Sequence, residues 1–379
     1  MRVAMLTTRW AEDLDAPTGG VEAVLASLVP ALLRVQPDLD LHVVHCPAKE
    51  RATRKLGAPA FTLHQLPGRV SGIYRFRPFS PRRRIEDFIA ELRPDVVHVQ
   101  TVPFLFDGRR CPAVLTVHGM RERDALFETC VAPWLRSWTL GRIERAARAT
   151  YRHIIALTGY AAQYLRAHTG GRLHFVPNPV DEGFFTVRRE EAGPCIVFVG
   201  RVRILKNIHG LIEAVGLLAR DGVECTLRLA GPLESAAYGE RLRGLVQRWR
   251  LEGRVEFLGN LDRPALREAM RTARCLVLPS FQENAPMVVS EAGAMGIPAV
   301  AAAVGGAPEM VAHGYSGFLV DPRSPASIAA GLKPLLLDAS LAATFGERAR
   351  DLAQVYHPDA VARQTLAVYE TVAEEFRSR

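Results

Sequence analysis

The sequence contains very little lysine. Only four of its 48 basic residues are lysines, and the rest are arginines. The simplest explanation for this excess of arginine is the base composition of the gene, so the excess alone indicates no function. It does make a lysine at a special position more noticeable. The four are Lys49, Lys55, Lys206 and Lys333.

The chain also lacks paired cysteine motifs and long apolar runs. None of its six cysteines forms Cys-x-x-Cys, and most lie in apolar segments, as Cys195 does. This pattern argues against a zinc site or a disulfide framework and favours buried thiols in a reducing compartment. The segment Met1–Leu6 is too short for a signal peptide. We therefore expect a soluble cytoplasmic protein, with peripheral contact to the inner face of a membrane left open.

Two common nucleotide-binding motifs are missing. Neither Gly-x4-Gly-Lys-Ser/Thr nor Gly-x-Gly-x-x-Gly occurs, which argues against a P-loop kinase or a simple dinucleotide oxidoreductase. The pairs Asp13/Asp15 and Asp38/Asp40 have the Asp-x-Asp form of some metal-diphosphate sites, but both stand in polar, turn-like contexts. We interpret them as loop charges, so no metal site and no cofactor is predicted.

Short apolar runs alternate with helical patterns along the 379 residues, which predicts an α/β fold with parallel sheets covered on both faces. A turn-rich and charged stretch near 177–194 divides the chain. We predict two Rossmann-like, doubly wound domains at 1–180 and 181–357, followed by a helix over 358–379 that packs back toward the first domain. Strands are expected at Val3–Leu6, Leu41–Cys46, Val96–Val99, Ala113–Val117, His153–Leu157, Cys195–Val199, Thr226–Ala230, Val255–Leu258, Cys275–Leu278 and Ala299–Ala302.

The positive charge is concentrated in the first half. Residues 1–180 hold 25 basic against 16 acidic residues, and residues 181–379 hold 23 against 24. Residues 51–85 alone carry nine basic and no acidic residues. A solvated loop without function explains this stretch about as well as a surface for an anionic acceptor or anionic lipid headgroups. Nucleic acid is not favoured, because no nucleic-acid-binding motif accompanies it.

The strongest candidate site segment runs from Ser280 to Ala292. A predicted strand ends before it, and we expect a helix to begin near Ala285 with Asn284 as its N-cap. The amide groups of such a helix start suit a phosphate. Glu283 and Glu291 would repel a phosphate but suit hydroxyl groups, as in a sugar and a ribose. Each glutamate alone is more simply an ordinary surface or helix residue, whereas the combination favours function.

Cations follow the strand that ends at Val199. Gly200 is followed by Arg201 and Lys206, which would lie at the carboxyl edge of a parallel sheet, where ligands bind in such folds. Two cations there can hold a diphosphate and neutralise the charge on a departing phosphate. A pair of solvated loop cations is the less favoured interpretation.

Weaker signals come from glycine pairs and one histidine. Gly19 and Gly20 precede an apolar helix and allow a ligand to approach the backbone closely, although half of such pairs are merely turns. The pair Gly305-Gly306 is explained as easily by helix capping. His118 ends an apolar strand and is followed by glycine, so we expect it to point into a cleft.

The ordered set of these motifs resembles glycosyltransferase family 4 (GT4), whose members are retaining enzymes with the GT-B architecture of two Rossmann-like domains facing a central cleft. The resemblance covers nearly the whole chain. Its motifs are Gly19-Gly20-Val21-Glu22, His118-Gly119, Val176-Pro177-Asn178, Val199-Gly200-Arg201 with Lys206, Leu229-Ala230-Gly231-Pro232, Val255-Glu256-Phe257-Leu258-Gly259, Glu283 and Glu291 in Glu-x7-Glu spacing, Gly296-Ile297-Pro298, and Gly305-Gly306 with Glu309.

The resemblance implies roles for the candidate residues. The second domain would bind a nucleotide diphosphate sugar, with its diphosphate on Arg201 and Lys206. Glu291 would take the ribose hydroxyls and Glu283 the sugar hydroxyls. The first domain would bind the hydroxyl acceptor, and His118, Gly19 and Gly20 would meet the donor. No metal would be needed. The remaining donor contacts would be backbone groups at Ala285, Pro286, Met287 and Val288.

Departures from the family pattern leave the donor open. Asn284, Ala285 and Pro286 replace the Gly or Ser and Phe-Gly of many members, and Asn207-Ile208 replaces Lys-Gly. The acceptor, whether polysaccharide, lipid-linked, anionic or a small molecule, also stays open. An epimerase or hydrolase of nucleotide sugars is the main alternative, and a non-catalytic basic protein would leave the second-domain motifs unexplained.

Overall fold

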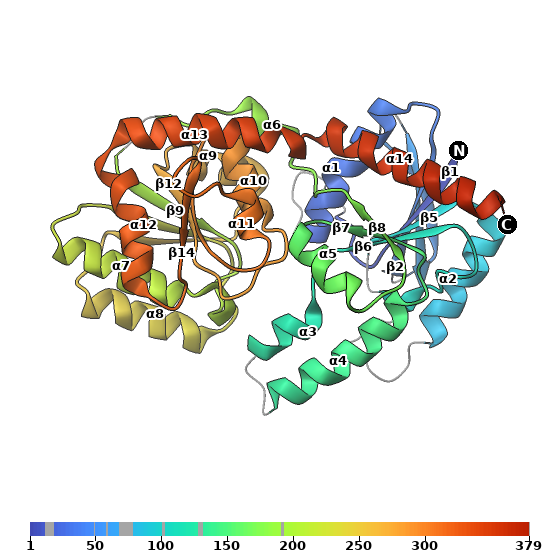
Figure 1. Cartoon of the computed structure of the whole chain (residues 1–379), viewed down its shortest axis with the longest axis horizontal. Coiled ribbons are helices and arrows are strands. Elements are labelled where there is room, and N and C mark those ends of the chain that lie inside the picture. The colour runs from blue at the N-terminus through green and yellow to red at the C-terminus, as the bar shows by residue number, and fades with distance from the viewer. Residues whose placement is uncertain are drawn as a thin grey trace. The chain divides into compact units, whose positions relative to one another are not determined.

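The computed structural model describes residues 1–11, 19–48, 50–57, 60–67, 79–100, 103–127, 132–190 and 193–378. These residues form two compact units. Unit 1 comprises Met1–Pro179 with Pro358–Arg379, and unit 2 comprises Val180–His357. Each unit is an α/β assembly around one sheet (Figure 1).

Unit 1 contains an eight-stranded sheet in the order β3-β4-β2-β1-β5-β6-β7-β8. Only β3 runs antiparallel to its neighbour among the described pairs. Strands are added outward from β1 on one side and from β5 to β8 on the other. The order in which strands are added therefore changes direction between β1 and β5, which run parallel. The strands are β1 (Arg2–Thr7), β2 (Asp40–Ala48), β3 (Ala52–Leu56), β4 (Phe61–Pro67), β5 (Val96–Val99), β6 (Ala113–Val117), β7 (His153–Ala156) and β8 (Arg172–Phe175).

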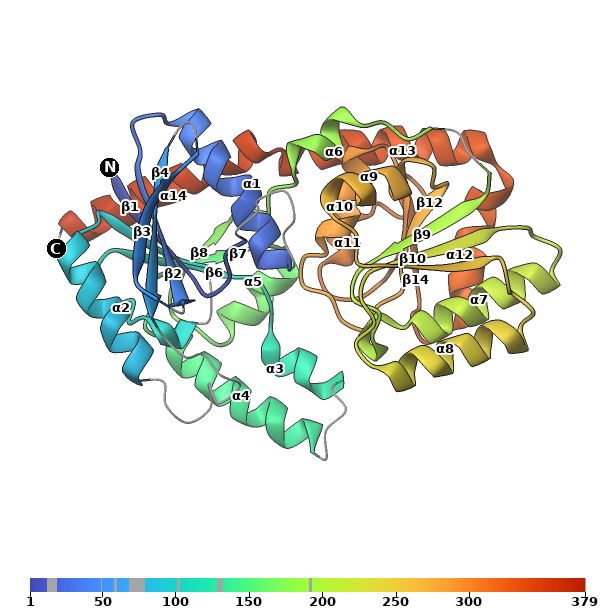
Figure 2. The same cartoon turned by 180° about the vertical axis from the view of Figure 1, so that it is seen from behind.

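The helices of unit 1 include the C-terminal segment. Helices α1 and α14 pack against each other, and the ion pair between Arg34 and Asp359 joins them at 2.6 Å. Both views place α14 and α4 on opposite sides of this unit's sheet (Figure 2). The helices are α1 (Gly20–Val35), α2 (Phe79–Leu92), α3 (Arg121–Asp124), α4 (Pro133–Arg148), α5 (Gly159–Arg166) and α14 (Pro358–Arg377).

Unit 2 contains a six-stranded parallel sheet in the order β11-β10-β9-β12-β13-β14. Strands are added outward from β9 to β11 on one side and from β12 to β14 on the other, so β9 and β12 form the switch point of the sheet. The strands are β9 (Cys195–Val199), β10 (Thr226–Ala230), β11 (Val255–Gly259), β12 (Cys275–Leu278), β13 (Ala299–Ala302) and β14 (Gly317–Val320). The helices are α6 (Glu182–Thr186), α7 (Ile208–Arg220), α8 (Ala236–Arg248), α9 (Arg263–Arg271), α10 (Met287–Ala294), α11 (Ala307–Met310), α12 (Pro325–Leu337) and α13 (Ala339–Ala353).

The sequence predicted the central strands well because these strands are completely buried. Strands β5, β6, β12 and β13 are buried along their whole length, because helices cover both faces of a parallel sheet. Such strands read as continuous apolar runs. The strands that the sequence did not reveal are β3, β4, β8 and β14. Three of these are sheet edges, where side chains are partly exposed and the apolar signal is weak.

The basic stretch 51–85 is not the solvated loop that its composition also allowed, at least where it is described. It contains β3, β4 and the start of α2. Arg54 and Lys55 are exposed on β3, whereas Arg82 forms ion pairs with Glu86 and Asp107. Residues 58–59 and 68–78 lie outside the described part, and the second range includes Arg69, Arg75 and Arg77. Asp13 and Asp15 also lie outside it.

Among the described cysteines, Cys46, Cys111, Cys195, Cys225 and Cys275 are free thiols. Burial raises the pKa of Cys46 to about 12, which keeps this side chain a thiol. Within the described ranges, no single helix is both long and apolar enough to cross a membrane.

Candidate active site

The candidate donor site of unit 2 lies where two loops leave neighbouring strands. The loop Gly200–Lys206 follows β9, and the loop from Pro279 to Pro286 follows β12. The order of strands along the chain changes direction between β9 and β12, and the carboxyl ends of strands at such a switch point are where open α/β sheets bind ligands. The structure thus brings together the segments that the sequence singled out separately.

Lys206 and Glu283 form the charged centre of these loops. The Lys206 Nζ donates a hydrogen bond to Glu283 Oε1 at 2.5 Å. Their side chains are 18% and 10% exposed, so the pair is shielded but still reachable. An ammonium group carries three N–H donors, and one of them serves Glu283. The pair therefore keeps both a cation and a carboxylate available at one point.

Asn207 fixes the first loop, and sequence reasoning missed this role. Its backbone is left-handed, with φ of 57°, and its side chain is 1% exposed. The Nδ2 atom donates hydrogen bonds to the carbonyl groups of Pro279, at 3.2 Å, and Pro322, at 2.6 Å. Asparagine tolerates a left-handed backbone better than most residues. One of the residues that depart from the family pattern thus connects the β9 loop to the β12 loop.

A second backbone contact supports this connection. The amide of Phe281 donates to the carbonyl group of Leu205 at 2.9 Å. Gly305, at φ of 59°, lies so close to Glu283 that a Cβ atom would stand 1.7 Å from the Glu283 carbonyl oxygen. Gly305 is therefore required for the placement of Glu283, which is a more specific role than the capping that the sequence also allowed.

The amino end of α10 differs from the prediction in two respects. The helix begins at Met287 with Pro286 as its N-cap, and no side chain caps it, so Asn284 is not the N-cap. Pro286 has no N–H group and cannot donate to a phosphate. Of the four predicted backbone contacts, Ala285, Met287 and Val288 retain a donor.

Glu291 lies one helical turn further along α10. Burial raises the pKa of this carboxyl to about 7, the attraction of Arg263 lowers it, and repulsion by Asp181 raises it. Asp181 itself accepts from Arg263 at 2.9 Å and from Arg267 at 3.2 Å. No described residue donates a hydrogen bond to the Glu291 carboxylate, so a ligand hydroxyl would find an unused acceptor there.

Arg201 is the least constrained member of the predicted set. Its side chain is exposed and makes no ion pair with any residue of the described part. It follows Gly200, whose φ is 144° and whose carbonyl oxygen would lie 2.0 Å from a Cβ atom on Gly231. These two glycines let the loops after β9 and β10 pass each other and leave Arg201 at the edge.

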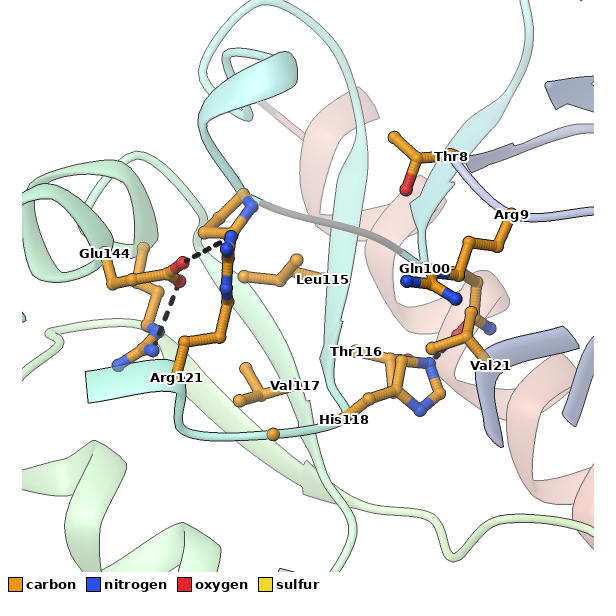
Figure 3. A pocket seen from close by; sticks show the side chains of 13 residues that line it. Thr8, Arg9, Val21, Gln100, Leu115, Thr116, Val117, His118, Arg121 and Glu144 are labelled. Atoms are coloured by element: carbon orange, nitrogen blue, oxygen red, sulfur yellow. Dashed lines mark hydrogen bonds and ion pairs between the residues drawn. The ribbon is translucent and has the colours of Figure 1, made fainter. Parts of the chain in front are cut away.

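Unit 1 contains a cavity of about 330 Å³ beside the carboxyl ends of β1, β5 and β6. Its lining includes Thr8, Arg9, Gln100 and His118 on one side and Arg121 on the other (Figure 3). Gly19 and Gly20 begin α1, whose Val21 also lines the cavity. The three sequence-predicted residues of this unit, Gly19, Gly20 and His118, thus lie at or beside one cavity.

A buried polar chain leads from α14 to His118. The ring of His98 contacts the Tyr369 hydroxyl at 2.6 Å through Nδ1 and the Thr116 hydroxyl at 2.7 Å through Nε2. Gln100 Nε2 lies 3.4 Å from His98 Nδ1, and Gln100 Oε1 lies 2.6 Å from His118 Nε2. Each link constrains the next, so the orientation of the Gln100 amide sets which nitrogen of His118 carries the proton.

His98 and His118 are both neutral at pH 7. Burial lowers the pKa of His98 to about 3, with repulsion from His118 as a second cause, and burial lowers the pKa of His118 to about 4. Because Gln100 Oε1 accepts from His118 Nε2–H, the Nδ1 atom of His118 can only accept a hydrogen bond. Sequence reasoning found His118 but not His98, Gln100 or Tyr369.

The opposite wall of the cavity is built on buried charge. Arg148 is 1% exposed and donates to both carboxylate oxygens of Glu122, at 2.8 and 3.2 Å, and to Glu144 at 3.3 Å. Burial raises the pKa of Glu144 despite the attraction of Arg148. Burial also acts to raise that of Glu122, but the hydrogen bond and charge of Arg148 outweigh it and lower the pKa. Arg121 approaches Glu144 to 3.9 Å.

Comparison with known proteins places both halves of the chain. The family model of the group 1 glycosyl transferases matches residues 180–352, and the model of glycosyltransferase family 4 matches residues 18–184. The D-inositol 3-phosphate glycosyltransferase of Jonesia denitrificans is 33% identical over 290 residues, which are 70% of this chain and 67% of that protein. Four other enzymes of that name match over 41–44% of their length, and that of Pseudarthrobacter chlorophenolicus matches over 66%.

Solved structures agree on the fold. Sucrose-phosphate synthase from Thermosynechococcus elongatus superposes with a TM-score of 0.83 at 21% identity, covering 99% of both chains. The Anabaena protein HepE in complex with UDP-glucose superposes with a TM-score of 0.71 at 19% identity, covering 100% of both chains. Both sheets, the ordered motifs and these matches lead to one assignment: the chain belongs to glycosyltransferase family 4 and is a glycosyltransferase of the GT-B fold.

Proposed function

We propose that this chain transfers a sugar from a nucleotide diphosphate sugar to a hydroxyl group, with retention of the anomeric configuration and without a metal ion. The observation that carries the proposal is the Lys206–Glu283 pair at the carboxyl ends of β9 and β12. The structure of HepE in complex with UDP-glucose supports a donor of this class.

In this proposal unit 2 binds the donor. Glu283 accepts hydrogen bonds from the sugar hydroxyls, and Lys206 uses its remaining N–H groups on the diphosphate. Arg201, which is exposed at the edge of the site, adds a second cation. The amide groups of Met287 and Val288 at the start of α10 contribute the positive end of a helix dipole. Glu291 accepts from the ribose hydroxyls.

The cations would also serve the chemistry. The acceptor oxygen forms a bond to the anomeric carbon on the face from which the diphosphate leaves, and the bond from that carbon to the phosphate oxygen breaks. The departing phosphate oxygen takes the acceptor proton. Lys206, Arg201 and the α10 dipole stabilise the negative charge that develops on this oxygen, which is the role a metal ion has in other transferases.

Unit 1 would bind the acceptor in the cavity that His118 lines. Arg9 and Arg121 line this cavity, and residues 1–180 carry the surplus of positive charge, 25 basic against 16 acidic residues. These charges favour an acceptor that carries an anionic group. The donor contact of His118, Gly19 and Gly20 stays a prediction.

A panel of UDP-, GDP- and ADP-sugars tests the donor class. Binding to the folded state raises the melting temperature by mass action, so a matching donor should raise Tm. The corresponding nucleoside diphosphate without its sugar should raise it less. The anomeric proton signal of the product, compared with that of the donor, reports retention. Activity that survives a chelator supports metal independence, and its loss would contradict it.

The alternative, an epimerase or hydrolase of nucleotide sugars, predicts turnover without an acceptor. Incubation with donor alone separates the two. We expect slow hydrolysis at most and no epimer, and rapid formation of an epimer would replace the transferase proposal.

A further inference from the structure

Helix α4 has its charged and apolar faces reversed relative to an ordinary surface helix. Its inward face carries Glu144 and Arg148, which are 4% and 1% exposed. Its outward face carries Trp134, Trp138 and other apolar side chains. A helix at the surface of a soluble domain normally shows the opposite arrangement.

The outward residues form one continuous stripe. Trp134 is 68% exposed, Leu135 45%, Trp138 56% and Ile143 45%. Leu135, Trp138 and Ile143 follow Trp134 by one, four and nine residues, which places the four on the same side of the helix. Every other described helix carries at most one large exposed apolar side chain. We call these four residues the α4 stripe.

The inward face explains why the stripe persists. The carboxylates of Glu122 and Glu144 converge on Arg148, and the Tyr164 hydroxyl donates to Glu122 at 2.8 Å. Turning α4 about its axis to bury the tryptophans would expel this ion network and leave its charges without partners. The stripe is therefore held outward by the packing beneath it.

Positive charge borders the stripe. Arg142 stands between Trp138 and Ile143 in the helix and stacks on Trp138, with its guanidinium carbon 5.2 Å from the ring centre. Arg145 is partly exposed beside it, and Arg152 is exposed just beyond the helix. The single acidic residue of α4 is Glu144, which is buried. The face thus combines tryptophan, aliphatic side chains and arginine, a composition that suits the boundary between anionic headgroups and acyl chains.

The same charges argue against a second copy of the chain as the occupant. In a symmetric dimer two copies of the stripe would face each other, which brings two faces bordered by arginine together. An anionic surface instead complements both the arginines and the tryptophans, whose amphipathic rings are favoured at membrane interfaces.

We infer that the α4 stripe docks unit 1 on the surface of an anionic lipid leaflet, with Trp134 and Trp138 inserted among the headgroups. The sequence had suggested membrane contact through the basic stretch 51–85, and the stripe is a different surface. The inference concerns binding alone, so a vesicle assay tests it independently of the proposed transfer reaction.

The test measures flotation of the full chain with vesicles of phosphatidylcholine, alone or with about a third of phosphatidylglycerol. Wild type should bind the mixed vesicles. The double variant Trp134→Ser/Trp138→Ser should bind them at least about tenfold more weakly, because two large apolar anchors are lost. Arg142→Gln should weaken binding about fivefold, and this loss should shrink in high salt.

A matched control uses exposed aromatic side chains elsewhere in unit 1. Phe175 and Phe376 are 54% and 45% exposed, so Phe175→Ser/Phe376→Ser removes comparable apolar surface outside α4. This variant should bind vesicles as wild type does. Melting temperatures of both double variants close to that of wild type would show that a loss of binding does not come from unfolding.

Tryptophan fluorescence gives a direct second readout. Bromine atoms on the acyl chains should quench the emission of wild type, because quenching requires an indole in the leaflet, and should spare the tryptophan double variant. The inference is overturned if wild type ignores the mixed vesicles, if both double variants lose binding equally, or if the tryptophan variant binds unchanged. A dimer that the tryptophan variant converts to a monomer, without loss of vesicle binding, would assign the stripe to a second copy.

Discussion

The two candidate sites handle charge in different ways. In unit 2, Lys206 and Glu283 pair directly at the edge of the sheet, 18% and 10% exposed, on loops that two neighbouring strands supply. In unit 1, the charges that line the cavity are anchored in the core, where Arg148 is 1% exposed and holds two carboxylates. The first arrangement leaves a cation and a carboxylate accessible to a ligand, whereas the ion network of the second supports one side of the cavity.

This difference predicts which changes affect activity and which affect stability. Removing a charge at the unit 2 edge should impair transfer while the fold survives. Removing a charge from the unit 1 wall should cost stability first, because a buried ion that loses its partner is strongly unfavourable.

The largest expected effect is that of Arg148→Met. It leaves Glu122 and Glu144 buried without their cation, and we expect a loss of about 4 kcal/mol of unfolding free energy. Amide hydrogen exchange, followed separately in each unit, should show the loss in unit 1. Lowering the pH should reduce the loss as the carboxylates become protonated. In the control Arg271→Met, which breaks ion pairs of exposed Glu190 and Glu268, the change should stay below about 1 kcal/mol. Equal losses in both variants would contradict the contrast.

Lys206→Ala should come next. We expect kcat/KM for transfer to fall about 10²–10³-fold, since a cation opposite the departing phosphate is lost, with little change in melting temperature. Lys333→Ala is the matched control, because Lys333 is 45% exposed and only approaches Asp221 to 3.7 Å. Glu283→Ala should act like Lys206→Ala. Full activity in both site variants would remove them from the reaction.

Glu291→Gln should change how nucleotide binding depends on pH. The carboxyl has a pKa of about 7 in the folded chain, and ionisation strengthens it as an acceptor for ribose hydroxyls. The wild-type Kd for the nucleotide should therefore fall about tenfold between pH 6 and pH 8. The variant should lack this part of the slope, and the phosphates of the nucleotide titrate equally in both. Parallel slopes would contradict the assignment.

The same group also predicts a trend in stability. Its pKa in the folded chain lies above the ordinary glutamate value of 4.5, so the folded state binds the proton more tightly than the unfolded state. The Glu291 contribution to stability is therefore full below about pH 4.5 and is lost as the pH rises through about 7. Thermal unfolding of wild type and Glu291→Gln across this range measures it.

Tyr369→Phe should give the smallest effect and shows how far the α14 chain reaches. It removes the hydroxyl on His98 Nδ1 and should raise KM or lower kcat a few-fold through the orientation of Gln100. Nitrogen chemical shifts of the imidazoles report the tautomer of His118 directly, and we expect a mixture in the variant. Tyr151→Phe, a buried tyrosine bonded to the carbonyls of Pro103 and Phe106, should leave His118 unchanged. An unaltered His118 in both would make Tyr369 a purely structural residue.

The sequence predicted the unit 2 site better than the unit 1 cavity for a physical reason. Arg201, Lys206 and Glu283 follow buried strands within seven residues, so each is marked by an apolar run that ends in a turn, and Glu291 lies on the helix that begins after the same turn. The chain His98–Gln100–His118 with Tyr369 depends on a contact across 271 residues. Apolar periodicity carries no record of such a partner. The sequence did not reveal the inverted faces of α4, because an apolar pattern shows that a helix is amphipathic but does not show which face is covered.

The opposed faces of α4 have a kinetic consequence. The same helix that carries the α4 stripe also contributes Glu144 and Arg148 to the cavity lining, so a leaflet against the stripe would lie one helix away from the cavity that we propose for the acceptor. An acceptor anchored in that leaflet would arrive by lateral diffusion in two dimensions. Its rate of glycosylation would then follow the number of acceptors per unit area of membrane, and dilution with inert lipid would slow the reaction at constant bulk concentration.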